Sequence, residues 1–200
     1  MGSEEEHESR AILSPWQVAF EEHKQWLQTD IDPLDWHGFE YRAPGFDVNE
    51  EVNKRKNGRV IDVGGPSRFV GDNFGVDSSD IKKVWSTNLE KTAYPGTREK
   101  VDFQSDARNL PLESGSADVI FSEGFSHVVK AHGDEIFPEM HRILKDGGLY
   151  LLHATDTEGV KKAENAGFEV KEIANIDQTD PGNLFIVVFQ KRQTNSSSNT

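Results

Sequence analysis

The residues best suited to hold a ligand follow a short apolar run in the first third of the chain. Val60–Val63 is rich in β-branched side chains and predicts a buried parallel strand. Asp62 lies within this run, and Gly64, Gly65 and Ser67 follow it at once. Glycine lets the backbone turn sharply and approach a ligand with no Cβ in the way. A strand that ends in such a turn and leads into a helix is typical of sites for nucleotide-type cofactors, although these residues also suit an ordinary strand-to-helix turn.

Polar residues also follow three later strands of the predicted fold. The strand 84–90 closes on an acid, the loop 106–108 comes after the strand 100–105, and the segment 122–127 begins at the last residue of the strand 117–122. The carboxyl ends of parallel strands meet at one edge of a sheet, because right-handed crossovers return each strand in the same direction. These segments and the glycine turn therefore predict one shared ligand site at that edge.

The rest of the chain supplies the elements that must position these residues. Ser14 as N-cap, Pro15 in the first turn and Gln17 at the capping-box position predict a helix that ends near Thr29. Helical or strand spacing predicts further helices at 135–144 and 158–166 and further strands at 149–153, 168–176 and 184–190. Alternating strands and helices predict an α/β fold with a mainly parallel sheet, and the last two strands predict an antiparallel hairpin.

Four segments are expected along the chain. Residues 1–13 form a charged, disordered N-terminus, 14–56 an N-terminal helix and an aromatic flap, 57–192 the main domain, and 193–200 a disordered tail. The flap is rich in aromatic residues and proline. It is interpreted either as packing that covers one edge of the domain or as a lid over a substrate pocket.

Composition narrows the classes of partner. The formal net charge of −13 should repel phosphate backbones and anionic membranes, so a small-molecule substrate is favoured over nucleic acid or membrane partners. The chain contains no cysteine, and no His spacing suits a metal, so disulfides, thiolate nucleophiles and metal sites are not expected. No apolar run approaches the ~20 residues of a membrane-spanning helix, which favours a cytoplasmic protein.

Several of these segments resemble the class I S-adenosylmethionine-dependent methyltransferases, in particular the small-molecule group called type 11. Residues 61–68 are similar to the first motif of that family, 88–90 to the second, and 106–112 to the third. The sequences 116–122 and 139–148 resemble the family's fourth strand and the helix and Gly-Gly turn before its fifth strand. The resemblance covers about residues 58–191 and implies a compact variant of the Rossmann-like fold with seven strands.

The resemblance implies a set of residues for the cofactor S-adenosyl-L-methionine. Gly64 and Gly65 would approach its amino-acid end, with Asp62 accepting hydrogen bonds there. Glu90 would accept from both ribose hydroxyls, because a carboxylate takes two donors side by side. Around the adenine, Asp106 would accept from the exocyclic amine, Ala107 would donate its backbone N–H, and Leu89 and Leu110 would flank the ring. The cofactor-binding residues expected from the family motifs are Asp62, Gly64, Gly65, Ser67, Leu89, Glu90, Asp106, Ala107, Arg108 and Ser122.

Two histidines are candidates for the general base of methyl transfer. His127 follows the fourth strand, where members of this family often carry a histidine, and a neutral imidazole takes a proton near pH 7. His153 ends the fifth strand and is expected to face the same site, and Glu123 is a weaker candidate. Local packing is an alternative role for His127, and His132 is interpreted as a surface or helix residue.

Three functions are compatible with these features. The first is methyl transfer to an O or N atom of a small, neutral or cationic acceptor. The second is a binding or regulatory subunit with a degraded site, because the first motif is one residue short and the helix after it is interrupted by glycine. The third is an enzyme of the same fold that catalyses a different reaction. A homodimer or a partner protein is compatible with each of them.

Overall fold

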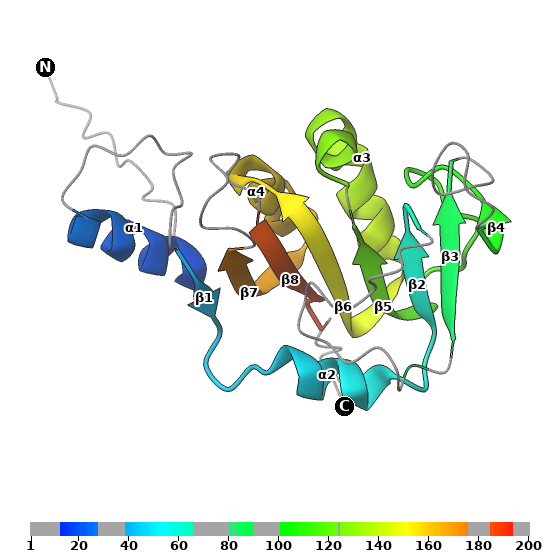
Figure 1. The fold of residues 1–200 in the computed structure, drawn as a ribbon, viewed down its shortest axis with the longest axis horizontal. Coiled ribbons are helices and arrows are strands. Elements are labelled where there is room, and N and C mark those ends of the chain that lie inside the picture. The colour runs from blue at the N-terminus through cyan, green and yellow to red at the C-terminus, as the bar shows by residue number, and fades with distance from the viewer. Residues whose placement is uncertain are drawn as a thin grey trace, which may run out of the picture.

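The computed structural model describes residues 13–27, 39–65, 81, 83–89, 101–123, 125–175 and 185–193. A single eight-stranded sheet runs through this part of the chain, with the strand order β1-β7-β8-β6-β5-β2-β3-β4 (Figure 1). The strands are β1 (Tyr41–Arg42), β2 (Val60–Val63), β3 (Val84–Asn88), β4 (Phe103–Gln104), β5 (Ala117–Ser122), β6 (Leu144–Thr155), β7 (Phe168–Asn175) and β8 (Phe185–Lys191). The helices are α1 (Pro15–Leu27), α2 (Val48–Arg55), α3 (Ser126–Ile143) and α4 (Thr157–Asn165).

The directions of the strands confirm the predicted α/β fold. β4, β3, β2, β5 and β6 are parallel, whereas β8 runs antiparallel to both of its neighbours, β6 and β7. The sheet has one strand more than the seven expected, because β1 pairs antiparallel with β7. Arg42 on β1 donates to Glu172 on β7 at 2.6 Å, which ties the aromatic flap to the sheet edge. β1 has only two residues, which is too few for an alternating apolar pattern, so the sequence could not predict it.

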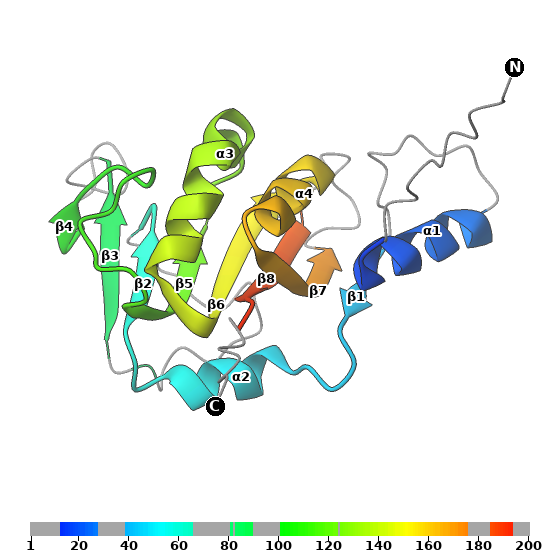
Figure 2. The same ribbon diagram turned by 180° about the vertical axis from the view of Figure 1, so that it is seen from behind.

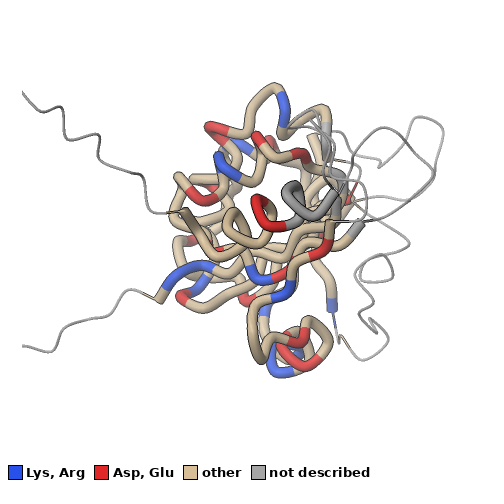
Figure 3. Tube along the Cα trace, turned by 90° about the vertical axis from the view of Figure 1, so that its left-hand side faces the viewer, with Lys and Arg blue, Asp and Glu red and all other residues tan. Residues whose placement is uncertain are grey.

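The N-terminal helix begins as predicted. The backbone N–H of Ser14 donates to the side-chain oxygen of Gln17 at 2.8 Å, which is one half of a capping box. The sequence analysis did not anticipate α2, although its signal is present. Asp47 caps this helix by accepting from the N–H of Glu50 at 2.9 Å. Acidic residues lie in the first turn of α2 and basic residues in its last turn, and both colours are visible on this helix at the bottom of Figure 3.

Two apolar clusters hold the layers together. The larger lies between the sheet and the helices α1, α3 and α4, and Figure 2 shows α3 and α4 across that face. The smaller is on the opposite face, where Val48 and Val52 of α2 pack against Val60, Val119 and Leu151. Side chains of a strand point alternately to the two faces, so each central strand contributes to both clusters.

One ion pair with a buried carboxylate fixes the loop that follows β4. The carboxylate of Glu139 on α3 accepts from the backbone N–H of Leu110 at 2.6 Å and from two nitrogens of Arg142 at 2.7 Å each. Arg142 also donates to the carbonyls of Leu110 and Leu112, at 3.1 and 2.8 Å. The pair therefore forms hydrogen bonds with one backbone N–H and two backbone carbonyls of the same loop.

The pKa of Glu139 reflects two opposing effects. Burial alone would raise it, because the ionised form loses hydration. The hydrogen bonds from Arg142 and from the Leu110 N–H outweigh burial and lower the pKa of Glu139 below its ordinary value. The carboxylate is therefore charged at neutral pH and pairs with the guanidinium.

We predict that Glu139→Gln lowers the free energy of unfolding by about 1.5–3 kcal/mol, because the charged hydrogen bonds from Arg142 and from the Leu110 N–H to a buried carboxylate are lost. Urea denaturation measures this value. The matched control is Glu158→Gln on α4, whose carboxylate is 73% exposed and 3.4 Å from Lys162, and which should cost less than about 1 kcal/mol. Equal losses in the two variants would contradict a special role for Glu139.

Candidate functional site

A cavity of about 560 Å³ lies at the carboxyl edge of β2, β3 and β4, beside the start of α3. In Figure 1 this edge is at the upper ends of the strands. Its volume falls in the range of pockets for small ligands. The walls are Val63, Gly64, Thr87, Asn88, Leu89, Ser105, Asp106, Ala107, Arg108, Phe125, His127, Val128, Ala131 and His132. The predicted convergence of the glycine turn with segments after β3, β4 and β5 is therefore present.

The glycine turn is held in place from two sides. The N–H of Gly64 donates to the carbonyl of Thr87 at 2.8 Å, and the side-chain amide of Asn88 donates to the carbonyl of Gly64 at 3.0 Å. Gly64 has a φ of +94°, which side chains with a Cβ rarely adopt. A Cβ at this position would also lie 3.0 Å from the ring of Phe125. Both features require glycine here.

The neighbouring residues of the turn are also closely packed. Asp62 is buried, and a Cβ on Gly65 would overlap its carboxylate. Gly65 therefore lets the backbone lie directly against the Asp62 carboxyl group, which no residue with a Cβ would allow. Ser67, the other predicted residue of this turn, lies outside the described residues.

Apolar surface forms the next part of the wall. Leu89 lines the cavity and is 64% exposed, so its side chain is available to a flat ring. Val128 and Ala131 of α3 line the cavity as well. Leu110, which was also predicted to flank the ring, is buried in the larger apolar cluster and is not part of the wall. Glu90 lies outside the described residues.

Asp106 and Arg108 pair with each other at the mouth of the cavity. The Asp106 carboxylate accepts from the backbone N–H of Arg108 at 2.9 Å and from its side chain at 2.7 to 3.1 Å. The side-chain hydrogen bonds, followed by the backbone one, lower the pKa of Asp106 to about 2. Asp106 is therefore an ionised acceptor at any physiological pH, with several of its acceptor positions already in use.

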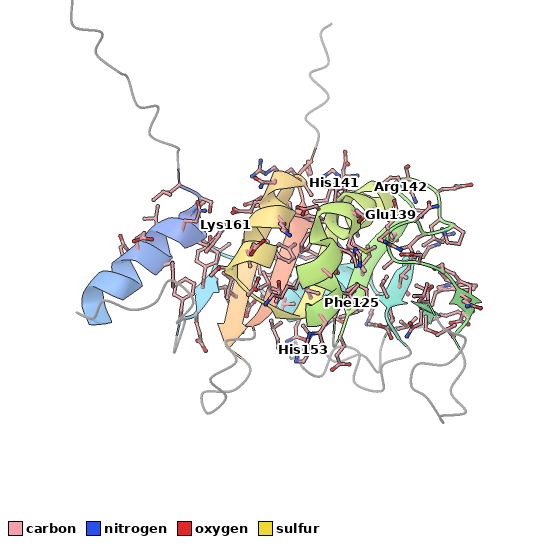
Figure 4. All side chains as sticks on the ribbon, turned by 90° about the horizontal axis from the view of Figure 1, so that it is seen from above. Phe125, Glu139, His141, Arg142, His153 and Lys161 are labelled. Atoms are coloured by element: carbon pink, nitrogen blue, oxygen red, sulfur yellow. The ribbon has the colours of Figure 1, made fainter. Side chains whose placement is uncertain are left out.

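The two predicted bases occupy different places. His127 is exposed in the first turn of α3 and lines the cavity, whereas His153 does not line it. His153 shares its face of β6 with Leu149 and Leu151, and Figure 4 places it away from α3 and α4. Burial lowers the pKa of His153, which keeps its imidazole neutral. The geometry thus favours His127 over His153 as a base at this cavity.

Ser122 and Glu123 end up near the cavity without forming its wall. Ser122 is fully buried at the end of β5, and Glu123 is half-buried beyond it. Neither is among the residues that line the cavity.

Sequence reasoning missed several wall residues. Asn88 and Phe125 stood beside predicted site residues, but their contacts with Gly64 depend on the folded turn. His132, which was interpreted as a surface or helix residue, lies within α3 and also lines the cavity. The reason is a kink in α3, where His132 has the non-helical angles φ −134° and ψ 18°. The sequence predicted a helix that starts at 135, whereas α3 begins at Ser126, so the predicted helix did not include His132.

Comparison with known families identifies the central part of the chain. Residues 67–152 match the family model described as a methyltransferase domain, of the type 11 family that the sequence resembles. This part of the chain is similar to methyltransferase domains. The family indicates an S-adenosylmethionine-dependent enzyme. A search of curated proteins finds no match.

Solved structures agree with this fold. An S-adenosylmethionine-dependent methyltransferase from Methanosarcina mazei is 14% identical, with a TM-score of 0.50 over 74% of this chain and 100% of that one. The [4+2]-cyclase SpnF is 14% identical, with a TM-score of 0.53 over 90% of this chain and 97% of that one. A complex of the Haloferax volcanii Trm112 methyltransferase activator with a methyltransferase is 17% identical over 72% of this chain and 90% of that one, with a TM-score of 0.49. At these identities the first two structures show the fold alone, and the third adds nothing to the argument.

The methyltransferase domain implies S-adenosylmethionine, and the described wall residues fit that group. The cavity offers a glycine turn over a buried carboxylate at one end and an exposed leucine with an ionised acid at the other. The glycine turn suits the amino-acid end of S-adenosylmethionine, and the leucine with the acid suits its adenine. Within the described residues, no helix is long and apolar enough to cross a membrane, and no group of three or more ligating side chains is suited to a metal ion.

We predict that Gly64→Ala weakens binding of S-adenosylhomocysteine by about tenfold or more, because a Cβ displaces the Phe125 ring and strains the turn. Calorimetry measures the affinity. Gly115→Ala is the matched control, since Gly115 also has positive φ, at +64°, but has open space around its Cβ position. It should cost stability and leave the affinity unchanged. Equal affinity in both variants would contradict this function of Gly64.

We predict that Asp106 stays ionised from pH 7 down to pH 4, because its pKa is about 2. The lowered pKa means that its pair with Arg108 contributes stability above the ordinary pKa and loses it as the pH falls toward 2. The contribution is small, since Arg108 is 41% exposed and water screens the pair. Carbon-13 NMR of the carboxyl group should show no titration in this range, whereas in Arg108→Gln the midpoint should return toward about 3.9. A wild-type midpoint above pH 4 would contradict the pairing.

Proposed function

We propose that the chain transfers a methyl group to an O or N atom of a small-molecule acceptor, with His127 as the general base. The observation that supports this most directly is the position of His127, which shares the cavity wall with the glycine turn and Phe125. When S-adenosylmethionine is bound, it supplies a methyl group on a positively charged sulfur. The protein then has to hold an acceptor in line with that group and exclude water.

Each wall supports one part of this task. The turn at Gly64 and Gly65, above Asp62, would hold the amino-acid end of the cofactor. Leu89 and the loop 106–108 would hold its adenine. The base at His127 would take the proton that an acceptor hydroxyl or neutral amine loses as its O or N atom forms the new bond to carbon. These assignments agree with the family motifs, and the positions of their described members around one cavity support them.

The charge of the chain favours a neutral or cationic acceptor. The formal net charge is −13, so an anionic acceptor would be repelled on approach. His153 is the less favoured base, because it is absent from the cavity wall. A cytoplasmic location and assembly with a second copy or a partner protein remain predictions of the sequence.

The experiment measures methyl transfer from S-adenosylmethionine to a panel of small hydroxyl and amine compounds, by the release of S-adenosylhomocysteine. We expect His127→Gln to lower kcat by about a hundredfold or more, which is the usual contribution of a general base. The affinity for S-adenosylhomocysteine should be unchanged. Lys130→Gln is the control, because Lys130 is exposed on α3 three residues further on and does not line the cavity.

Three outcomes would contradict parts of the proposal. Wild-type turnover in His127→Gln would exclude it as the base. No heat with either S-adenosylmethionine or S-adenosylhomocysteine would support a binding or regulatory subunit with a degraded site. Cofactor binding without transfer to any acceptor of the panel would support an enzyme of the same fold with a different reaction.

A further inference from the structure

A second cavity of about 310 Å³ lies on the other side of the loop 105–112 from the first one. Its walls are Arg59, Ile61, Trp85, Phe103, Pro111 and Leu112. It shares no residue with the cavity proposed for the cofactor. Trp85 is 41% exposed, which is unusual for the largest apolar side chain, and exposed apolar surface of this kind often marks a binding site.

The sheet explains why this surface is open. Ile61 on β2 is the direct neighbour of Trp85 on β3, and Thr87 on β3 pairs with Phe103 on β4. Side chains at i and i+2 lie on one face, so Ile61, Trp85 and Phe103 share the face on which α3 packs further along the sheet. Ile61 belongs to the larger apolar cluster, whereas Trp85 and Phe103 do not. The side chains of these two residues therefore remain available to a ligand.

Two cations stand beside each other at the rim of this cavity. Val60 pairs with Val84, so Arg59 and Lys83 lie immediately before the first residues of two neighbouring strands. The ammonium of Lys83 lies 3.4 Å from the centroid of the Trp85 ring. Among the described residues neither side chain forms an ion pair. Like charges on neighbouring strands repel each other, and an anion placed between them would remove that cost.

Two of the described acids near this rim are already bonded. Asp118 accepts from the backbone N–H of Arg59, but its carboxylate also accepts from Lys145 at 2.8 Å. Asp102, which precedes Phe103, accepts from the backbone N–H and the hydroxyl of Ser86. The two cations thus differ from the rest of a strongly acidic protein, and an apolar floor lies directly below them.

We infer that this second cavity binds a small aromatic anion, with its ring against Trp85 and Phe103 and its carboxylate between Arg59 and Lys83. The volume admits one or two fused rings, and the apolar walls with two cations match an amphipathic acid. A guanidinium binds a carboxylate in a bidentate manner, and stacking on an indole adds attraction that a purely ionic surface would not give. This inference is independent of the proposed methyl transfer.

The test uses 2-naphthoate as the probe and 2-naphthamide as its neutral counterpart. Titrations are followed by calorimetry and by the indole N–H resonance of Trp85, which Trp85→Phe identifies. They are repeated with S-adenosylhomocysteine at saturation, so that binding in the first cavity is excluded. We expect saturable binding of the acid and a shift of the Trp85 resonance. The amide should bind about tenfold more weakly than the acid, or more weakly still, because a charged hydrogen bond is lost.

Variants complete the test. Arg59→Gln and Lys83→Gln should each weaken binding of the acid several-fold and leave that of the amide unchanged. Lys161→Gln is the control, since Lys161 is an exposed cation on α4, at the other end of the sheet in Figure 4. Equal affinity for acid and amide would overturn the inference and indicate an apolar protein surface as the occupant. Loss of the Trp85 shift when S-adenosylhomocysteine is bound, or wild-type affinity in Arg59→Gln, would overturn it as well.

Discussion

The buried carboxylate of Glu139 determines the shape of both cavities. It bonds the backbone of Leu110, and its partner Arg142 bonds the carbonyls on either side of Pro111. The loop that these bonds fix carries Asp106–Arg108 into the wall of the first cavity and Leu112 into the wall of the second. A loop cannot be held this way by apolar contacts alone, because its buried N–H and C=O groups need partners. One ion pair meets that need and places two surfaces at once.

The helix that carries Glu139 also carries His127, and the kink at His132 separates their functions. Before the kink, the side chains of Val128 and Ala131 face the first cavity together with His127. After it, residues such as Ile136 and Met140 are fully buried in the larger apolar cluster. A change of direction lets the first turns lie against a ligand while the later turns pack against the sheet. The candidate base is therefore anchored by the same helix whose Glu139 and Arg142 hold the loop 105–112.

Apolar patterns and strand order predicted the fold and the edge that carries the site, because both depend on short-range spacing and on the handedness of crossovers. What failed were features decided by tertiary contacts. β1 is too short to have a pattern, and the polar α2 was visible only in Asp47 and Glu50, three residues apart. The position of His132 follows from a kink, which spacing does not encode. The pairing of Asp106 with Arg108 reflects a local choice of side chains that the family motif alone does not reveal.

That pairing bears on how the site could distinguish ligands. A carboxylate has about four acceptor positions, and Arg108 directs a backbone N–H and two side-chain nitrogens at those of Asp106. An amine arriving at Asp106 would share or replace hydrogen bonds that already exist, so the net gain from this contact is small. The attraction for a ring must then come mainly from the apolar surface of Leu89, Val128 and Ala131, at roughly 25 cal/mol for each Å² removed from water. In this cavity Asp106 would favour a ring that carries an amine on its edge, and the apolar side chains of the wall would supply most of the affinity.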